Sequence, residues 1–304
     1  MARFILIRII QAIITLFVIS IVVFSLARAS GDPVMLMAPA MATMEDIEVI
    51  RKDLGLDKSL PEQYWVFLKN LAHGDLGESI HNRKAVSSLI GDRLPNTITL
   101  GLPAIFLAII VSVVLGVTSA YKFGTWMDTG VKLLAVLGQA LPSFWLAIAA
   151  IFIFAVWLGW LPTSGMGSPA HYVLPVLTLS FFTLPILTRL VRSSMLEVLD
   201  SEYIKLARIK GISEMKVIWK HALRNAIITL MTAAGITFGT IITGAVVIET
   251  VFSWPGIGRL MADAVIGRDF PIVQAAVLLV AIVVLGVNLL VDVAYAYVDP
   301  RIRY

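Results

Sequence analysis

The chain has 304 residues, of which 59% are apolar and only 14% carry a charge, and its mean hydropathy is +0.90. This composition excludes a water-soluble globular protein, and with it soluble enzymes, nucleic-acid binders and disordered scaffolds. The sequence pI near 9.3 is therefore interpreted as a signal of membrane orientation, not of nucleic-acid binding. Because the chain contains no cysteine, disulfides, thiol catalysis and thiolate metal sites are excluded as well.

Five stretches are free of Asp, Glu, Lys and Arg, and they run 9–27, 94–121, 133–188, 225–248 and 270–291. One membrane span needs about 20 apolar residues, so the longest stretch has room for two. The sequence therefore predicts an all-α integral membrane protein with six transmembrane helices, over 5–26, 98–120, 133–157, 172–191, 226–250 and 271–297. The first of these has the basic start of a signal peptide but no small-residue cleavage pattern, so we retain it as a membrane helix.

The orientation follows from the Lys and Arg residues of the short loops. If both termini are cytoplasmic, 14 of them lie on that side and two, Arg259 and Arg268, on the other. The positive-inside rule thus predicts a chain with both ends in the cytoplasm (N-in/C-in). The expected organisation is a first transmembrane helix at 1–26, an extracytoplasmic helical loop domain at 27–97, a five-helix core at 98–298 with a cytoplasmic loop at 192–225, and a cytoplasmic tail at 299–304.

The extracytoplasmic loop between the first two spans contains helix punctuation. Thr43 and Asp46 have the spacing of a capping box at a helix start, and Gly55 is typical of a helix end. Pro61 suits the first turn of a second helix. That helix would carry an apolar stripe formed by Tyr64, Trp65, Leu68 and Leu71. These signals predict a small helical cap on the outer face.

The second outer connection, 252–270, allows two interpretations. Phe252 and Trp254 suit an interfacial aromatic belt. The Pro-Gly pair at 255–256, followed by Gly258, suits a turn that dips back toward the bilayer, and the alternative is a plain surface loop.

The cytoplasmic loop 192–225 has the pattern of two helices separated by a glycine. Ser201 is a good N-cap for a helix that runs to Lys210, Gly211 fits the left-handed residue after a helix end, and a second helix can begin behind Ser213. On the first helix an apolar edge is flanked by basic residues. A helix this short, held outside the bilayer, needs a partner to be stable. The candidates are an anionic lipid surface or a groove on another protein.

The residues Glu202–Gly211, followed by His221–Ala226, resemble the cytoplasmic "EAA" loop of the permeases of ABC importers, and most closely those for peptides and nickel. Lys205 and Leu206 depart from the general pattern in a way that this branch shares. Further strings of the same branch occur in order along nearly the whole chain: Gly31-Asp32-Pro33, Gly74-Asp75-Leu76-Gly77, Arg93-Leu94-Pro95-Asn96-Thr97, Leu141-Pro142-Ser143-Phe144-Trp145, Phe252-Ser253-Trp254-Pro255-Gly256-Ile257-Gly258, Arg268-Asp269-Phe270-Pro271 and Asp299-Pro300-Arg301.

The resemblance implies a transport subunit, not an enzyme, in a bacterial or archaeal cytoplasmic membrane. No glycine in the chain precedes a lysine, so the Walker phosphate loop is absent, and ATP with Mg is expected on partner ATPases while this chain binds no cofactor. The implied partners are two ABC ATPase subunits, a second homologous permease, an extracytoplasmic solute-binding protein and the lipid bilayer. The implied cargo is a di- or oligopeptide, with a nickel chelate as the alternative.

By the same resemblance, the segment 201–210 is the coupling helix that an ATPase grips, and Gly211 sets the angle of the helix that follows. The residues expected to carry this coupling are Ser201, Glu202, Tyr203, Lys205, Leu206, Ala207, Arg208, Lys210 and Gly211.

Polar and special residues within the predicted spans allow more than one role. Gln139, Ser143, Thr183 and Asn288 are candidates for the substrate path, although interhelical hydrogen bonds are their commoner use. Prolines at 142, 175 and 185 kink helices and serve either as hinges or as static bends. The pair Gly235 and Gly239 predicts a close helix approach.

Two acids near span ends, Glu249 and Asp292, are candidates for proton or cation sites. The preferred interpretation is that they snorkel to the interface or pair with local arginines. The four histidines have no metal-ligand spacing.

Two other classes of function fit the sequence less well. An intramembrane enzyme would need a G-x-S-x-G element, a zinc-type histidine pair or an acidic dyad, and none is present. An ion-gradient-driven secondary transporter would need a paired acid in mid-membrane and internal repeats, for which the sequence gives no convincing pattern.

Overall fold

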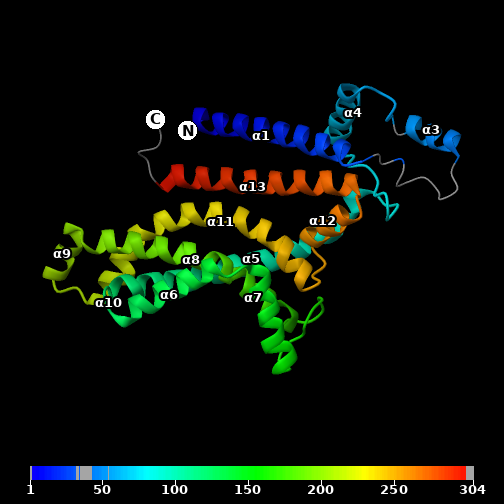
Figure 1. Ribbon diagram of the computed structural model, residues 1–304. Coiled ribbons are helices and arrows are strands. Elements are labelled where there is room, and N and C mark those ends of the chain that lie inside the picture. The colour runs from blue at the N-terminus through cyan, green and yellow to red at the C-terminus, as the bar shows by residue number, and fades with distance from the viewer. Residues whose placement is uncertain (1, 32–33, 35–42, 54, 299–304) are drawn as a thin grey trace.

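The computed structural model describes residues 2–31, 34, 43–53 and 55–298, and within these ranges the chain is helical with short connections and no extended strand. The predicted tail at 299–304 and Asp32-Pro33 lie outside the described residues. Figure 1 shows the long helices side by side in one elongated bundle. The elements are α1 (Ala2–Ala29), α3 (Met44–Asp53), α4 (Leu60–Ala72), α5 (Val86–Tyr121), α6 (Trp126–Ala140), α7 (Ser143–Ala150), the π-helical η1 (Ile151–Trp157), α8 (Ala170–Leu199), α9 (Glu202–Ile209), α10 (Glu214–Lys216), the π-helical η2 (Val217–Ala222), α11 (Leu223–Val251), α12 (Ile257–Ile266) and α13 (Phe270–Val298).

Four of the described helices, α1, α5, α8 and α13, are each long and apolar enough to cross a membrane. The third predicted span, 133–157, is not one kinked helix, because α6 and the α7–η1 segment meet at an angle of 104°. The break lies at Leu141 and Pro142, where proline lacks the N–H that would continue the helix. In α11 the apolar stretch found is the shorter 237–251. The fold is therefore all-helical with several apolar spans, and the count of six stays a prediction.

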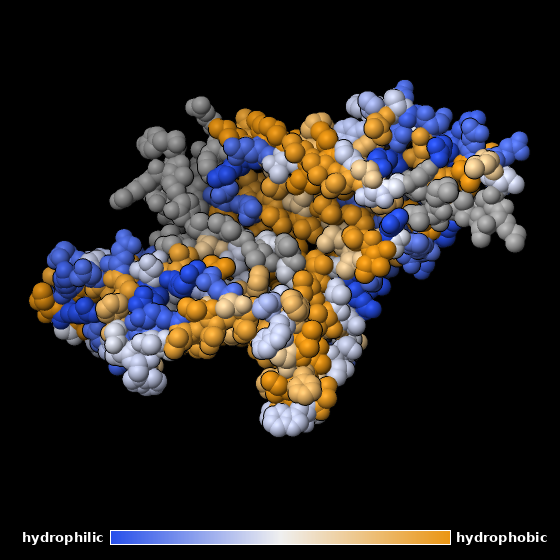
Figure 2. Space-filling model, in the orientation of Figure 1, coloured by the Kyte–Doolittle hydropathy of each residue, from blue (hydrophilic) through white to orange (hydrophobic). Residues whose placement is uncertain are grey.

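The two ends of the bundle differ in what they carry. In Figure 1 the start of α1 and the end of α13 lie at the same end as α9 and α10, whereas α3, α4 and α12 lie at the opposite end. Figure 2 shows apolar surface over the middle of the bundle, with polar residues gathered toward these two ends. This arrangement is compatible with termini and coupling loop on the same side of a bilayer.

Small residues let the helices of the bundle approach closely. A Cβ at Gly116 of α5 would lie 2.7 Å from the Val191 side chain of α8, and a Cβ at Gly138 of α6 would lie 2.6 Å from Pro185. The predicted close approach at Gly235 and Gly239 is confirmed, because both face valine side chains of α13. Such contacts allow van der Waals packing between backbones in lipid.

The two helices predicted in the loop between the first two spans are confirmed where the structure describes them. Thr43 accepts a hydrogen bond from the Asp46 N–H (3.2 Å), and the Asp46 carboxylate accepts one from the Thr43 N–H (2.9 Å) at the start of α3. Gly55 follows this helix with a φ of +64°. In α4, Tyr64 packs edge-on against Phe24 of α1. Contacts of this kind hold α4 against the C-terminal half of α1.

The connection 252–270 differs from the predicted aromatic belt. Phe252 and Trp254 are both fully buried, and the indole Nε1 of Trp254 donates to the backbone oxygen of Asn96 (2.9 Å). A Cβ at Gly258 would lie 2.5 Å from the Val246 Cα. The aromatic side chains therefore fasten the α11–α12 turn to α5, because a buried indole N–H needs an acceptor that a nearby backbone carbonyl supplies.

Of the two acids near span ends, Asp292 pairs with Arg8 of α1 (3.0 Å), as predicted. The prediction for Glu249 is wrong, because its side chain is fully buried and accepts hydrogen bonds from the Thr97 hydroxyl (2.7 Å) and the Arg259 backbone N–H (3.0 Å). Arg259 lies in the first turn of α12. At the start of a helix, a carboxylate accepts hydrogen bonds from free N–H groups and interacts favourably with the helix dipole. Glu249 therefore joins α5, α11 and α12.

This geometry predicts that Glu249→Ala lowers the free energy of unfolding by about 1–3 kcal/mol, because buried donors lose their acceptor. Thermal unfolding in detergent measures the change. Thr250→Ala is the matched control, since Thr250 is exposed and its hydroxyl bonds only within its own helix, and it should shift stability by less than about 0.5 kcal/mol. Equal effects of the two substitutions would contradict the assigned role of Glu249.

Candidate functional site

The predicted coupling helix is α9, and it follows α8 after a two-residue turn. Ser201 has the extended backbone of an N-cap, with φ −68° and ψ 149°. Its hydroxyl does not cap the helix but donates to the Val198 backbone oxygen at the end of α8 (2.5 Å). The serine thus ties the start of α9 to α8.

The end of α9 confirms the left-handed residue predicted at Gly211, whose φ is +73°. The Gly211 N–H donates to the Arg208 oxygen (3.0 Å), and the Ile212 N–H donates to the Ala207 oxygen (3.2 Å). These two bonds form the Schellman pattern, which satisfies carbonyls that a helix end leaves free. A Cβ at Gly211 would meet no atom within 4 Å, so the backbone conformation and not crowding favours glycine here.

The two faces of α9 have different surroundings. Ile204 and Ala207 are buried in an apolar cluster that includes Met195 of α8 and Val217 of η2. On the opposite face the side chains remain exposed, with Ile209 at 81%, Leu206 at 50% and Tyr203 at 44%. The partner that this short helix needs is therefore in part its own chain, and Ala207 faces the bundle interior.

The charged residues of α9 are largely paired within the loop. Lys205 lies 3.0 Å from Glu202 and 3.5 Å from Asp200, and the Glu202 carboxylate in particular raises the pKa of the Lys205 ammonium group. Arg208 donates two hydrogen bonds to Glu214 (2.8 and 3.2 Å), which joins α9 to α10. Lys210 is the C-cap of α9. These pairs hold the loop in one shape around the exposed apolar edge.

Three residues of this site were not among those predicted to carry coupling. Ile209 is the most exposed side chain of the α9 edge, and its i+3 spacing from Leu206 was the available signal. Asn225 donates to the Tyr203 hydroxyl oxygen (2.6 Å) and so links α9 to α11. Met215, just after α9, is also exposed.

The four residues predicted for the substrate path have different surroundings in this chain. Gln139 is exposed near the end of α6, and Ser143 begins α7, so these two flank the break in the third span. Thr183 is buried and its hydroxyl donates to Ser180 of its own helix (3.1 Å). Asn288 lines a cavity of about 400 Å³ between α1 and α13.

Within the described residues, no group of three or more His, Asp and Glu side chains could hold a metal ion. The arrangement at α9 offers instead a protruding apolar edge on a helix that is anchored by its other face. Such an edge suits recognition by a hydrophobic groove.

The chain matches two protein-family models along most of its length. Residues 112–304 match the family described as "Binding-protein-dependent transport system inner membrane component", and residues 1–101 match the N-terminal family of the same membrane components.

Relatives match over the whole chain. A putative peptide transport system permease protein of Brucella abortus is 43% identical, with 100% of both chains covered. The glutathione transport system permease protein GsiC of Escherichia coli is 40% identical, again with 100% of both chains covered.

Solved structures with the same fold are ABC transporters. The MetNI methionine ABC transporter in inward-facing conformations matches with a TM-score of 0.61 and 19% identity, over 69% of this chain and 96% of that one. An amino acid ABC transporter with histidines matches with a TM-score of 0.55 and 14% identity, over 69% and 94%. These likenesses concern the fold. Because the family models cover nearly all residues, this chain belongs to the family of inner membrane components of binding-protein-dependent transport systems.

Proposed function

We propose that this chain is the permease subunit of an ATP-driven importer, that its cargo is a peptide, and that α9 is the helix through which an ATPase subunit drives it. Full-length relatives named for peptide and glutathione transport support the cargo class over the nickel alternative. ATP and Mg are bound by separate ATPase subunits, since the chain lacks a Walker phosphate loop. A second permease chain and an external solute-binding protein complete the importer.

The single observation that carries the coupling role is the division of α9 into two faces. One face is packed into the core formed with α5 and α8, so a force on the helix is passed directly to spans. The other face presents Tyr203, Leu206 and Ile209 at the end of the bundle, beyond its apolar middle (Figures 1 and 2). A lever needs both an anchored side and a free contact side.

The charges of α9 favour a protein groove over a lipid surface as its partner. Attraction to anionic lipid needs free basic groups, whereas Lys205 and Arg208 are already paired with acids of the same loop. An apolar edge with paired charges around it suits a hydrophobic groove. The N-in/C-in orientation in a bacterial or archaeal cytoplasmic membrane places this edge on the side where ATP is available.

A photocrosslinking residue at Ile209 should join to an ATPase subunit in the assembled importer. Ile266 is the matched control, because it is exposed to a similar degree (84%) on α12 at the opposite end of the bundle, and it should give no such product. Ala207 should react poorly, since it is buried. The crosslinked products are detected by gel electrophoresis and an antibody to the ATPase. Crosslinks from Ile209 to phospholipid alone would contradict the proposal.

Substitutions at Gly211 test whether the angle after α9 matters. Gly211→Val should weaken co-purification of the ATPase and lower peptide uptake, because a β-branched residue at positive φ costs roughly 1–2 kcal/mol. Gly211→Asn should have the smaller effect, since asparagine tolerates this conformation. Gly211→Asn is therefore the control, because it changes the same position but tolerates a positive φ better than valine does. Uptake that is equal in both variants and in the unmodified chain would count against a role of this angle.

A further inference from the structure

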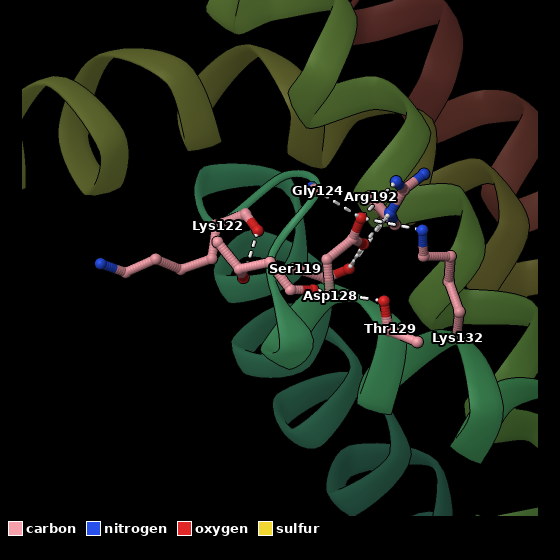
Figure 3. A network of polar contacts seen from close by, with 8 residues as sticks. Ser119, Lys122, Gly124, Asp128, Thr129, Lys132 and Arg192 are labelled. Carbon is pink, nitrogen blue, oxygen red and sulfur yellow. Dashed lines mark hydrogen bonds and ion pairs between the residues drawn. The ribbon is translucent and has the colours of Figure 1, made fainter.

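A buried carboxylate lies outside α9, in the first turn of α6. The Asp128 side chain is fully buried, and Figure 3 shows it surrounded by polar groups. Its two oxygens accept hydrogen bonds from Arg192 of α8, one from Nε (2.8 Å) and one from Nη2 (3.1 Å). Such a two-point arginine–carboxylate contact fixes the relative orientation of the groups it joins.

Further contacts of Asp128 extend the network to α5 and to the turn before α6. The Ser119 hydroxyl donates to Oδ1 (2.6 Å), the Gly124 N–H donates to Oδ2 (3.2 Å), and the Lys132 ammonium group lies 2.9 Å from Oδ2. Arg192 also donates to the Ser119 hydroxyl oxygen (3.1 Å). One carboxylate therefore joins the end of α5, the start of α6 and the inner part of α8.

Two of the helices that this network joins, α5 and α8, also pack against the coupling helix. From Arg192, α8 continues to Leu199 and turns into α9. The buried face of α9 shares its apolar cluster with Val117 and Ala120 of α5, which flank Ser119. At the other end of α6, Gly138 is held tightly against Pro185 of α8. Helix α6 is thus fastened to α8 near both of its ends.

Stability alone is a poor explanation for this network. Removing an acid and an arginine from water is costly, and well-packed apolar residues of similar volume often replace such a pair without loss of stability. A bidentate pair provides fixed geometry instead. Between helices that must move together, fixed geometry is what the transmission of a displacement requires.

We propose that Asp128 and Arg192 are positioning residues that make α6 move with α8 and α9 as one rigid body. A displacement of α9 is then carried along α6 to the break at Leu141 and Pro142, where the third span turns into α7. This inference rests on the proposed coupling role of α9. It adds that the third span follows α9 through an ionic contact that lies outside the coupling loop.

The test is a distance measurement between spin labels, which the absence of native cysteine makes straightforward. Labels are placed on introduced cysteines at Glu197, in the last part of α8, and at Val136 on α6, both of which are exposed. Pulsed electron resonance reads their distance in the reconstituted complex with the ATPases, without nucleotide and after trapping with ATP and vanadate.

In the chain that keeps Asp128 and Arg192, the distance should be the same in both states. With Asp128→Leu and Arg192→Met together, the mean distance should shift on trapping by about 2 Å or more, the scale of helix shifts in such transitions. A distance that stays constant in this double variant overturns the proposal. So does a distance that already changes on trapping when the pair is intact.

Two additions separate this role from folding and from the coupling proposal. If the apolar pair fails to assemble, Asp128→Asn with Arg192→Gln keeps hydrogen-bonding groups without charge and is measured in the same way. The matched control is Asp292→Leu with Arg8→Met, a neutralised pair between α1 and α13, which should leave the distance constant. Crosslinking from Ile209 in the same complexes reports whether α9 still contacts the ATPase, so loss of that contact is distinguished from loss of rigidity.

Discussion

A helix of eight residues outside the apolar part of a membrane protein cannot be stable without packing against something. The end of the bundle that carries α9 is built around that requirement. Ile204 and Ala207 bury one face of α9 in the core of α5 and α8, and the left-handed Gly211 closes the helix so that Ile212 returns to the same core. What remains outside is an apolar edge. Anchoring and exposure of one short helix together support the proposed role as a lever.

Two buried carboxylates, one near each end of the bundle, join helices that are distant in sequence. Glu249 joins α5 and α11 to the start of α12, and Asp128 joins α5 and α6 to α8. In an environment of low dielectric such contacts are strong when all hydrogen-bonding groups are satisfied. The helices between them pack through small residues such as Gly116 and Gly138. Fixed contacts near the ends and close packing between them suit a bundle whose parts move as bodies.

Features that depend on neighbours in sequence could be predicted from the sequence. The capping pair Thr43 and Asp46, the glycine at 211 and the apolar spans are of this kind. Features that depend on distant partners could not. The burial of Trp254 depends on an acceptor at Asn96, which is far away in the sequence. Around Asp128, hydropathy predicts only a short loop, because the partner of this residue, Arg192, is 64 positions away. The sequence likewise does not tell the two faces of α9 apart, because helical periodicity does not indicate which face packs against the core.

The most direct test of the lever is to make its free edge polar while leaving its anchored face unchanged. Leu206→Asp with Ile209→Asp alters only side chains that are exposed in this chain, so folding of the permease, measured by thermal unfolding, should be unaffected. ATP-driven uptake of labelled di- and tripeptides into proteoliposomes that hold the complete importer should be abolished, together with co-purification of the ATPase. Full uptake by this double variant would contradict the account.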